Sequence, residues 1–215
     1  VAATIAGVMN LEDALRLVAR RGRLMQAQPA GAMLSVRLDA DRLAARLPAS
    51  LEIAAENAPS ACVVSGQIAD IETLRVALEA DAVACRLLRT SHAFHSSMMD
   101  PVLEPFRAEV GQVELSPARI PIISTLTGKL LSDTEANSAD YWTRHLRGTV
   151  RFAGALSTAL DQYPDCAMLE VGPRATLTTL ARQQSRRPRR AIASMADTPA
   201  GEAGAWPPVG DLPTG

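Results

Sequence analysis

The fold is decided by residues 32–90, which have the sequence AMLSVRLDADRLAARLPASLEIAAENAPSACVVSGQIADIETLRVALEADAVACRLLRT. Ile71, Leu74 and Leu78 recur at the spacing of one helical face, and shorter apolar or alternating runs predict strands. The expected order is strand 32–38, helix 40–47, strand 51–56, strand 61–65, helix 70–81 and strand 84–90. This βαββαβ order is that of a ferredoxin-like unit, an antiparallel sheet with helices on one face.

The residues on either side of this block predict an α/β body. Asn10 can cap a helix that runs to about Met25, with Leu11, Leu15 and Val18 on its buried face. Beyond the block, strands and helices alternate as in α/β proteins. Helices are expected at 97–110, 138–147, 151–162 and 175–184, and strands at 120–124 and 167–171.

The ferredoxin-like block therefore interrupts a larger α/β fold. We expect the larger subdomain at 1–30 and 91–184 and the ferredoxin-like subdomain at 31–90. Residues 185–215 begin with a basic run and continue with Pro, Gly and Ala, a composition typical of a disordered linker.

Composition restricts the classes of function. Of the 215 residues, 47% are apolar and 21% are charged, and a net charge of −1 gives no field that attracts nucleic acid or a membrane surface. No apolar stretch approaches the roughly 20 residues that span a bilayer. Cys62, Cys85 and Cys166 form no disulfide or metal pattern, which is typical of a reducing cytoplasm.

Two histidines lie in Ser91-His-Ala-Phe-His-Ser96, at the exit of a predicted strand, where α/β proteins place functional groups. Histidine suits proton transfer near neutral pH, so this peptide is a candidate catalytic loop. A metal site at His92 and His95 lacks further ligands nearby, and two loop histidines without a role are the plain alternative. No G-x-S-x-G turn occurs in the chain, so these residues offer a base without a nucleophile.

Several separated motifs together resemble one family. They are Leu11-Glu-Asp-Ala-Leu-Arg-Leu-Val18, Arg21-Gly22, Asn57-Ala-Pro-Ser60, Ser91-His-Ala-Phe-His-Ser96, Tyr141-Trp-Thr-Arg-His-Leu-Arg147 and Leu169-Glu-Val-Gly-Pro173. In order and spacing they are similar to the acyltransferase domain of polyketide synthases, relatives of malonyl-CoA:acyl carrier protein transacylases, from Val1 to about Gln183. The resemblance implies an α/β-hydrolase-like large subdomain with an inserted ferredoxin-like one. In that family a G-H-S-x-G-E motif with the nucleophile precedes the stretch matching Val1, so we expect this downstream part to be inactive alone.

The resemblance implies a chemical role for three residues. His95 matches the family base that takes the serine proton and later returns it to the leaving thiol. Arg21 matches the arginine that binds the free carboxylate of the malonyl group, although by itself it could be a surface residue of a basic helix. Phe94 matches the position tied to a preference for malonyl over methylmalonyl, although it could also be ordinary core.

Three further residues have supporting roles by the same resemblance. The main-chain carbonyl of His145 is expected to accept a hydrogen bond from the catalytic histidine and fix its tautomer. Met25 and Asn57 match pocket-lining positions, and Asn57 before Ala-Pro could instead shape a turn.

The implied function is two-step transfer of a malonyl group from malonyl-CoA, through a serine ester, to the phosphopantetheine thiol of an acyl carrier protein. No metal and no permanent cofactor are implied. Malonyl-CoA, the carrier protein, and the ketosynthase and linker regions of the same synthase are the expected partners, and nucleic acid and membranes are not. The alternatives are an editing acyl hydrolase on the same scaffold and a truncated, non-catalytic module.

Overall fold

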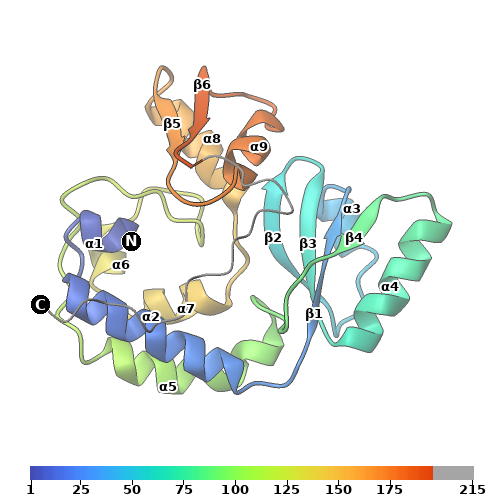
Figure 1. Cartoon of the computed structure of the whole chain (residues 1–215), viewed down its shortest axis with the longest axis horizontal. Coiled ribbons are helices and arrows are strands. Elements are labelled where there is room, and N and C mark those ends of the chain that lie inside the picture. Colours follow the sequence, from blue (N-terminus) through green and yellow to red (C-terminus); the bar gives the residue numbers. More distant parts are fainter. Residues whose placement is uncertain (196–215) are drawn as a thin grey trace, which may run out of the picture.

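The computed structural model describes residues 1–195, which form a four-stranded sheet with its helices and a larger, mainly helical part (Figure 1). The elements are α1 (Ala2–Ile5), α2 (Leu11–Gln26), β1 (Ala32–Val36), α3 (Ala40–Ala44), β2 (Glu52–Ala58), β3 (Ala61–Gly66), α4 (Ile68–Ala80), β4 (Cys85–Leu87), the 3₁₀ helix η1 (Ser97–Met99), α5 (Asp100–Val110), α6 (Asp133–Ala136), α7 (Ala139–Arg147), α8 (Phe152–Gln162), β5 (Ala167–Glu170), α9 (Thr176–Arg182) and β6 (Arg190–Ala193). Within residues 1–195, no helix is both long and apolar enough to cross a bilayer.

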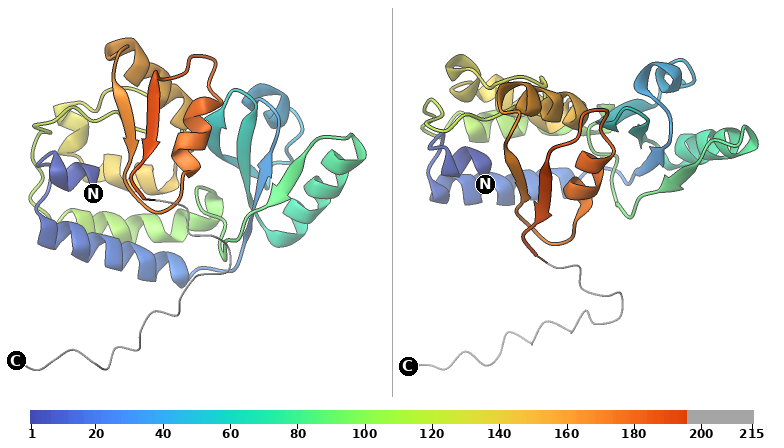
Figure 2. Two further views of the ribbon diagram at one scale, coloured as in Figure 1. Left: turned by 45° about the horizontal axis from the view of Figure 1, so that its top comes forward. Right: turned by 90° about the horizontal axis from the view of Figure 1, so that it is seen from above.

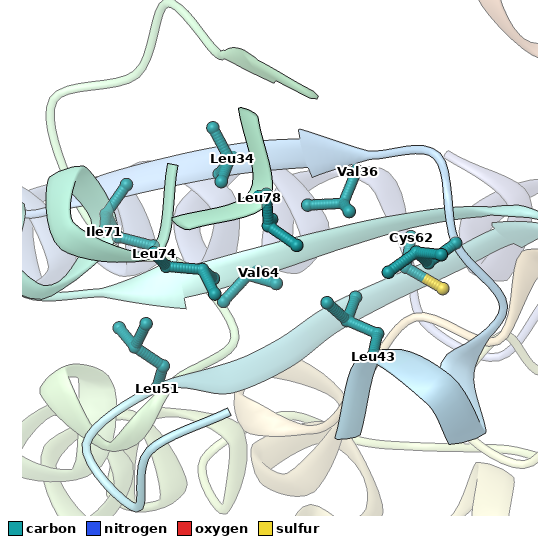
Figure 3. Packing of buried hydrophobic residues seen from close by; sticks show 10 residues of the cluster. Leu34, Val36, Leu43, Leu51, Cys62, Val64, Ile71, Leu74 and Leu78 are labelled. Atoms are coloured by element: carbon teal, nitrogen blue, oxygen red, sulfur yellow. The ribbon is translucent and has the colours of Figure 1, made fainter. Parts of the chain in front are cut away.

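The four-stranded sheet has the order β2-β3-β1-β4, and each neighbouring pair is antiparallel. Helices α3 and α4 cover one of its faces, where Leu43, Ile71 and Leu78 pack with Leu34 and Val64 in a buried apolar cluster (Figure 3). The βαββαβ prediction and the inward face of α4 are therefore confirmed. Both faces of the sheet are apolar, because successive strand residues point to opposite sides: Leu34 and Val64 meet the helices, whereas Met33 and Val63 point the other way.

The other face of the sheet contacts the loop at residues 91–96, which contains His92 and His95. Met33, Ala54 and Val63 are buried there, and Phe94 packs against them. The loop that follows β4 thus rests on the sheet that precedes it.

Helix α2 buries a different face from the predicted one. Asn10 caps it as expected, its side chain accepting a hydrogen bond from the amide of Asp13. Leu11, Leu15 and Val18, however, are 63%, 62% and 66% exposed, whereas Leu17 is 6% exposed and packs in one cluster with α5 and α7. Helical residues turn by about 100° each, so Leu15 and Leu17 point in nearly opposite directions, and tertiary contact with α5 selects the stripe that contains Leu17.

Two further predictions fail after residue 110. Residues 120–124 form no strand, and only an isolated bridge joins Ile123 to Leu130. Pro121 has no amide proton, and the chain turns back at Gly128, whose φ of +72° favours glycine. The expected linker contains β6, which pairs in parallel with β5 and lies next to α8 and α9 (Figure 2). The rest of that linker, residues 196–215, lies outside the described residues.

The two connections to the four-stranded sheet run side by side. The amide of Gly31 donates to the carbonyl of Ser91 at 3.1 Å. A Cβ on Gly31 would lie 2.6 Å from the Cβ of Ala93, so this close approach requires glycine. The chain therefore enters and leaves the small unit at one place, directly beside the histidine loop.

Candidate active site

His95 lies in the short loop between β4 and η1. Its φ is +58°, an uncommon conformation for a non-glycine residue that costs on the order of 1–3 kcal/mol and is concentrated at functional sites. The buried hydroxyl of the next residue, Ser96, donates to the carbonyl of Ala93 at 2.7 Å and ties the loop to itself. The backbone around His95 is thus held in one specific shape.

The His95 ring is oriented by a backbone carbonyl, that of Gly148. Nδ1 of His95 lies 2.9 Å from the carbonyl oxygen of Gly148. A carbonyl only accepts, so Nδ1 carries the proton and donates it, and Nε2 keeps the free lone pair that a general base needs.

The prediction that the carbonyl of His145 fills this role is therefore wrong by three residues. His145 belongs to α7, whose carbonyls follow the helix axis. At Gly148 the backbone leaves the helix with ψ of 157°, which turns its carbonyl toward His95. A Cβ at Gly148 would lie 2.4 Å from a methyl carbon of Leu126, so a larger residue would push this segment away.

The electrostatic surroundings keep His95 neutral. Burial lowers the pKa of its imidazole, and the nearby charges of Arg21 and Arg147 lower it further, while the bond to Gly148 acts in the opposite direction. A neutral imidazole with a fixed tautomer can accept a proton at pH 7.

Arg21 reaches the same region from α2. It lines a cavity of about 180 Å³ together with His145, Trp142 and other residues of α2, α5 and α7. Its Nε is buried and has no hydrogen-bond partner among residues 1–195, and burial lowers the pKa of the guanidinium. Arginine remains charged in proteins, so a half-buried, uncompensated cation faces this cavity.

His145 also lines the cavity. Burial, followed by the charges of Arg21 and His95, lowers the pKa of His145 to about 4. Its Nε2 lies 3.4 Å from the hydroxyl of Thr125, at the long end of hydrogen bonding. His145 is therefore a neutral polar wall of the cavity.

The remaining predicted residues divide into two groups. Phe94 and Met25 are half-buried and pack against the cluster formed by α2, α5 and α7, close to His95. Asn57 is a residue of strand β2, not of a turn, and its carbonyl accepts a hydrogen bond from the side chain of Gln184. Neither Asn57 nor Met25 lines the cavity beside Arg21.

His92 has a structural environment different from that of His95. Its Nδ1 lies 2.7 Å from the hydroxyl of Ser91 and its Nε2 lies 3.0 Å from the carbonyl of Gln28. Both ring nitrogens are thereby used in fastening the loop to the end of α2. Across residues 1–195, no three His, Cys, Asp or Glu side chains gather in a way that could hold a metal ion.

The residues that orient His95 could not be recognised from the sequence. A glycine at the end of a predicted helix is an ordinary stop signal, so Gly148 carried no functional mark. Glu52 and Arg147, which pair near this loop, are 95 positions apart and lie in different subdomains, and no local pattern joins them.

Known proteins share the sequence pattern and the fold of this chain. The family model described as the acyl transferase domain matches residues 1–200. A component of the phenolphthiocerol/phthiocerol polyketide synthase of Mycobacterium tuberculosis is 40% identical over 178 residues, which are 83% of this chain and 12% of that protein.

Solved structures agree with the family model. The acyl transferase domain of SpnD, in complex with 2-(pent-4-yn-1-yl)malonyl, is 34% identical and superposes with a TM-score of 0.87 over 92% of this chain and 48% of that chain. The malonyl CoA-acyl carrier protein transacylase from Clostridium perfringens, at 22% identity, shares the fold with a TM-score of 0.81 over 91% of this chain and 63% of that one.

This chain thus spans about half of the solved SpnD domain and a small part of the mycobacterial synthase component that it matches. The predicted α/β fold, with a ferredoxin-like unit inserted in an α/β-hydrolase-like body, is confirmed by these superpositions. The chain belongs to the acyl transferase domain family, in the form found in polyketide synthases.

Proposed function

We propose that the domain containing this chain transfers a malonyl group from malonyl-CoA to the phosphopantetheine thiol of an acyl carrier protein. The observation that carries the proposal is that an Arg21 guanidinium without an ion-pair partner among residues 1–195 lies near enough to the neutral, oriented His95 to lower its pKa. A cation without a partner suits a substrate with a free carboxylate, which malonyl has and acetyl lacks. The substituted malonyl bound by the SpnD domain has the same chemical class.

The reaction takes two steps, both with His95 as proton carrier. A serine hydroxyl, supplied by residues outside this chain, attacks the thioester carbonyl as Nε2 of His95 takes its proton; the carbon–sulfur bond breaks and His95 protonates the leaving CoA thiolate. The phosphopantetheine thiol then gives its proton to Nε2 and attacks the serine ester, and His95 returns the proton to the serine oxygen. No step uses a metal or a permanent cofactor.

The bond to Gly148 has a defined part in this cycle. It keeps the Nε2 lone pair directed away from the backbone and stabilises the imidazolium that forms in each step. Phe94, beside the base, would reduce the space for an α-methyl group, which is worth about 1–3 kcal/mol of preference for malonyl over methylmalonyl.

Arg21→Ala tests the assignment of the carboxylate site. In the domain that contains this chain, we expect kcat/KM for malonyl-CoA to fall ten- to hundredfold, because a charge-assisted hydrogen bond contributes roughly 1.5–3 kcal/mol. Transfer of acetyl, which has no carboxylate, should change little. Arg20→Ala is the matched control, since Arg20 points to the surface and pairs with Glu109 at 2.7 Å.

Two results would reject the proposal. An Arg21→Ala domain that keeps its malonyl rate would show that the cation serves another purpose. Release of the acyl group to water faster than transfer to carrier protein would favour the editing hydrolase. The chain by itself should form no covalent adduct with labelled malonyl-CoA, and a stable adduct would place the nucleophile within these residues.

We also assign the domain to the cytoplasm, with ketosynthase and linker regions of the same synthase as its neighbours.

A further inference from the structure

We propose that Glu52, on the edge strand of the small sheet, is the positioning residue that holds His95 and the carbonyl of Gly148 in register. The inference rests on the role proposed above for His95 as the base. It extends that role by assigning to the small subdomain a part in preparing the base, through one carboxylate that does not touch the imidazole.

The first step is the attachment of Gly148 to the sheet. After the end of α7, residues 148–151 run beside the free edge of β2, where Val150 forms an isolated parallel bridge with Ala55. The amide of Val150 donates to the carbonyl of Ala54, and the amide of Glu56 donates to the carbonyl of Val150, both at 2.9 Å. The Thr149 hydroxyl adds a bond to the carbonyl of Ile53 at 2.7 Å. The carbonyl that orients His95 is therefore carried by a segment fixed to the small sheet.

The second step is the position of the Glu52 carboxylate. Oε1 accepts a hydrogen bond from the amide of Ser97 at 2.6 Å, two residues after His95. Oε2 pairs with the Arg147 guanidinium at 2.8 Å, one residue before Gly148. One carboxylate therefore binds both segments of the chain that the His95–Gly148 hydrogen bond joins.

The third step is how firmly the ion pair between Glu52 and Arg147 is held. The guanidinium of Arg147 also pairs with Asp100 at 2.5 Å, at the start of α5, and the Arg147 side chain is only 24% exposed. Burial opposes the charge of Glu52, but the hydrogen bonds from Arg147 and Ser97 outweigh it and lower the pKa of Glu52. The carboxylate is therefore ionised at neutral pH and is shared between the amide of Ser97 in η1 and the guanidinium of Arg147 in α7.

The test measures the tautomer and the pKa of His95 in the full chain by imidazole ¹⁵N NMR, which needs no substrate. The charged and titratable groups around His95 are Arg21, Arg147 and His145, with Asp100 and Glu52 beyond Arg147. In Glu52→Gln we expect the preference for the Nδ1–H tautomer to fall about five- to tenfold, as a hydrogen bond of ordinary net strength is lost. The pKa of His95 should fall further below its ordinary range, because Arg147 is less compensated and the bond to Gly148 weakens. Glu52→Asp should restore part of both.

Two further variants sharpen the test. Glu56→Gln is the matched control, because Glu56 lies on the same strand and pairs with Arg151 of the same segment without reaching the histidine loop. Ser97→Pro removes the amide proton that Glu52 accepts, together with the Ser97 hydroxyl, at the first position of η1, where proline is tolerated. It should lower the preference of His95 for the Nδ1–H tautomer, as Glu52→Gln does.

The proposal is overturned by any of three results. An unchanged His95 tautomer and pKa in a folded Glu52→Gln chain would remove the role. A rise of the His95 pKa toward its ordinary value would indicate loss of burial, a purely structural effect. Equal shifts in Glu56→Gln would show that any charge on β2 acts this way. These readouts need no substrate and leave Arg21 unchanged in every variant, so a failure of the malonyl assignment is told apart from a failure of this one.

Discussion

His145 shows what burial does to a single polar side chain in this molecule. The resemblance to known acyltransferases implied a role for its backbone, yet its carbonyl stays in helix α7 and its buried ring lies within reach of the charge of Arg21. Placing a second cation beside Arg21 would be costly, so the ring stays neutral. Arg21 is then the one charged side chain among the described residues that line this cavity.

The low pKa of His145 predicts a pH dependence of stability. Its pKa is about 4 in the folded chain against an ordinary 6.5, so the unfolded chain binds more protons between these values. Stability from this group is complete above pH 6.5 and is lost as the pH falls toward 4. Between pH 7 and pH 5, the free energy of unfolding should drop by about 2 kcal/mol more in the wild type than in His145→Gln, measured by denaturant unfolding. Equal drops in both proteins would contradict the burial argument.

At the scale of one element, α2 carries two apolar stripes and buries one. The stripe with Leu17 packs on α5, and Arg21 lies one turn further along the same side. The stripe with Leu11, Leu15 and Val18 is exposed to solvent. The orientation of α2 therefore decides that Arg21 points into the cavity.

Paired truncations on α2 test this orientation. Leu17→Ala should cost about 2–3 kcal/mol of unfolding free energy, because it removes buried methyl groups beside a cavity. Leu15→Ala, at 62% exposure, should change it by no more than about 0.5 kcal/mol. Denaturant midpoints of the two variants decide the matter, and a larger loss at Leu15 would mean that the helix is rotated.

Elements with a single consistent pattern could be predicted from the sequence, and choices between patterns could not. The small sheet was predictable because short apolar runs mark its strands and the one apolar face of α4 allows a single arrangement. The buried side of α2 was not, since both stripes satisfy the same periodicity. His95 could be found from its peptide, but its partner Gly148 is 53 residues away and depends on how α7 ends. Strand β6 was missed because a basic run precedes it and only pairing with β5 gives it structure.

At the scale of the whole molecule, the described chain leaves one sheet half covered. Helices α8 and α9 pack on one face of the β5–β6 pair. On the other face Leu169 and Ile192, which are register partners, are 61% and 52% exposed, and Val171 and Met195 beside them are exposed as well. Parallel strands are normally covered on both faces, so this is an unusual amount of apolar surface in water.

The open face of β5–β6 should be detectable with an apolar fluorescent dye. We expect the native chain to bind anilinonaphthalene sulfonate, and the double variant Leu169→Ser with Ile192→Ser to bind clearly less. The free energy of unfolding of the double variant should stay within about 0.5 kcal/mol of the wild-type value. The matched control is Leu43→Ala in the closed core of the small sheet, which should lower stability by about 2–5 kcal/mol without lowering dye binding of the folded chain. No difference between the double variant and the wild type would place the dye elsewhere.

The meeting of Gly31 with Ser91 and Ala93 bears on the construction of chimaeric synthases. Because the chain crosses into the small sheet and out again at one place, residues 32–90 can be exchanged between relatives as a cassette with both joints together. Such a cassette carries its own Glu52 and its own edge strand. If Glu52 positions His95 as proposed, a donor without a carboxylate at that position would deliver a misaligned histidine, so donors should be chosen by this one residue before overall similarity.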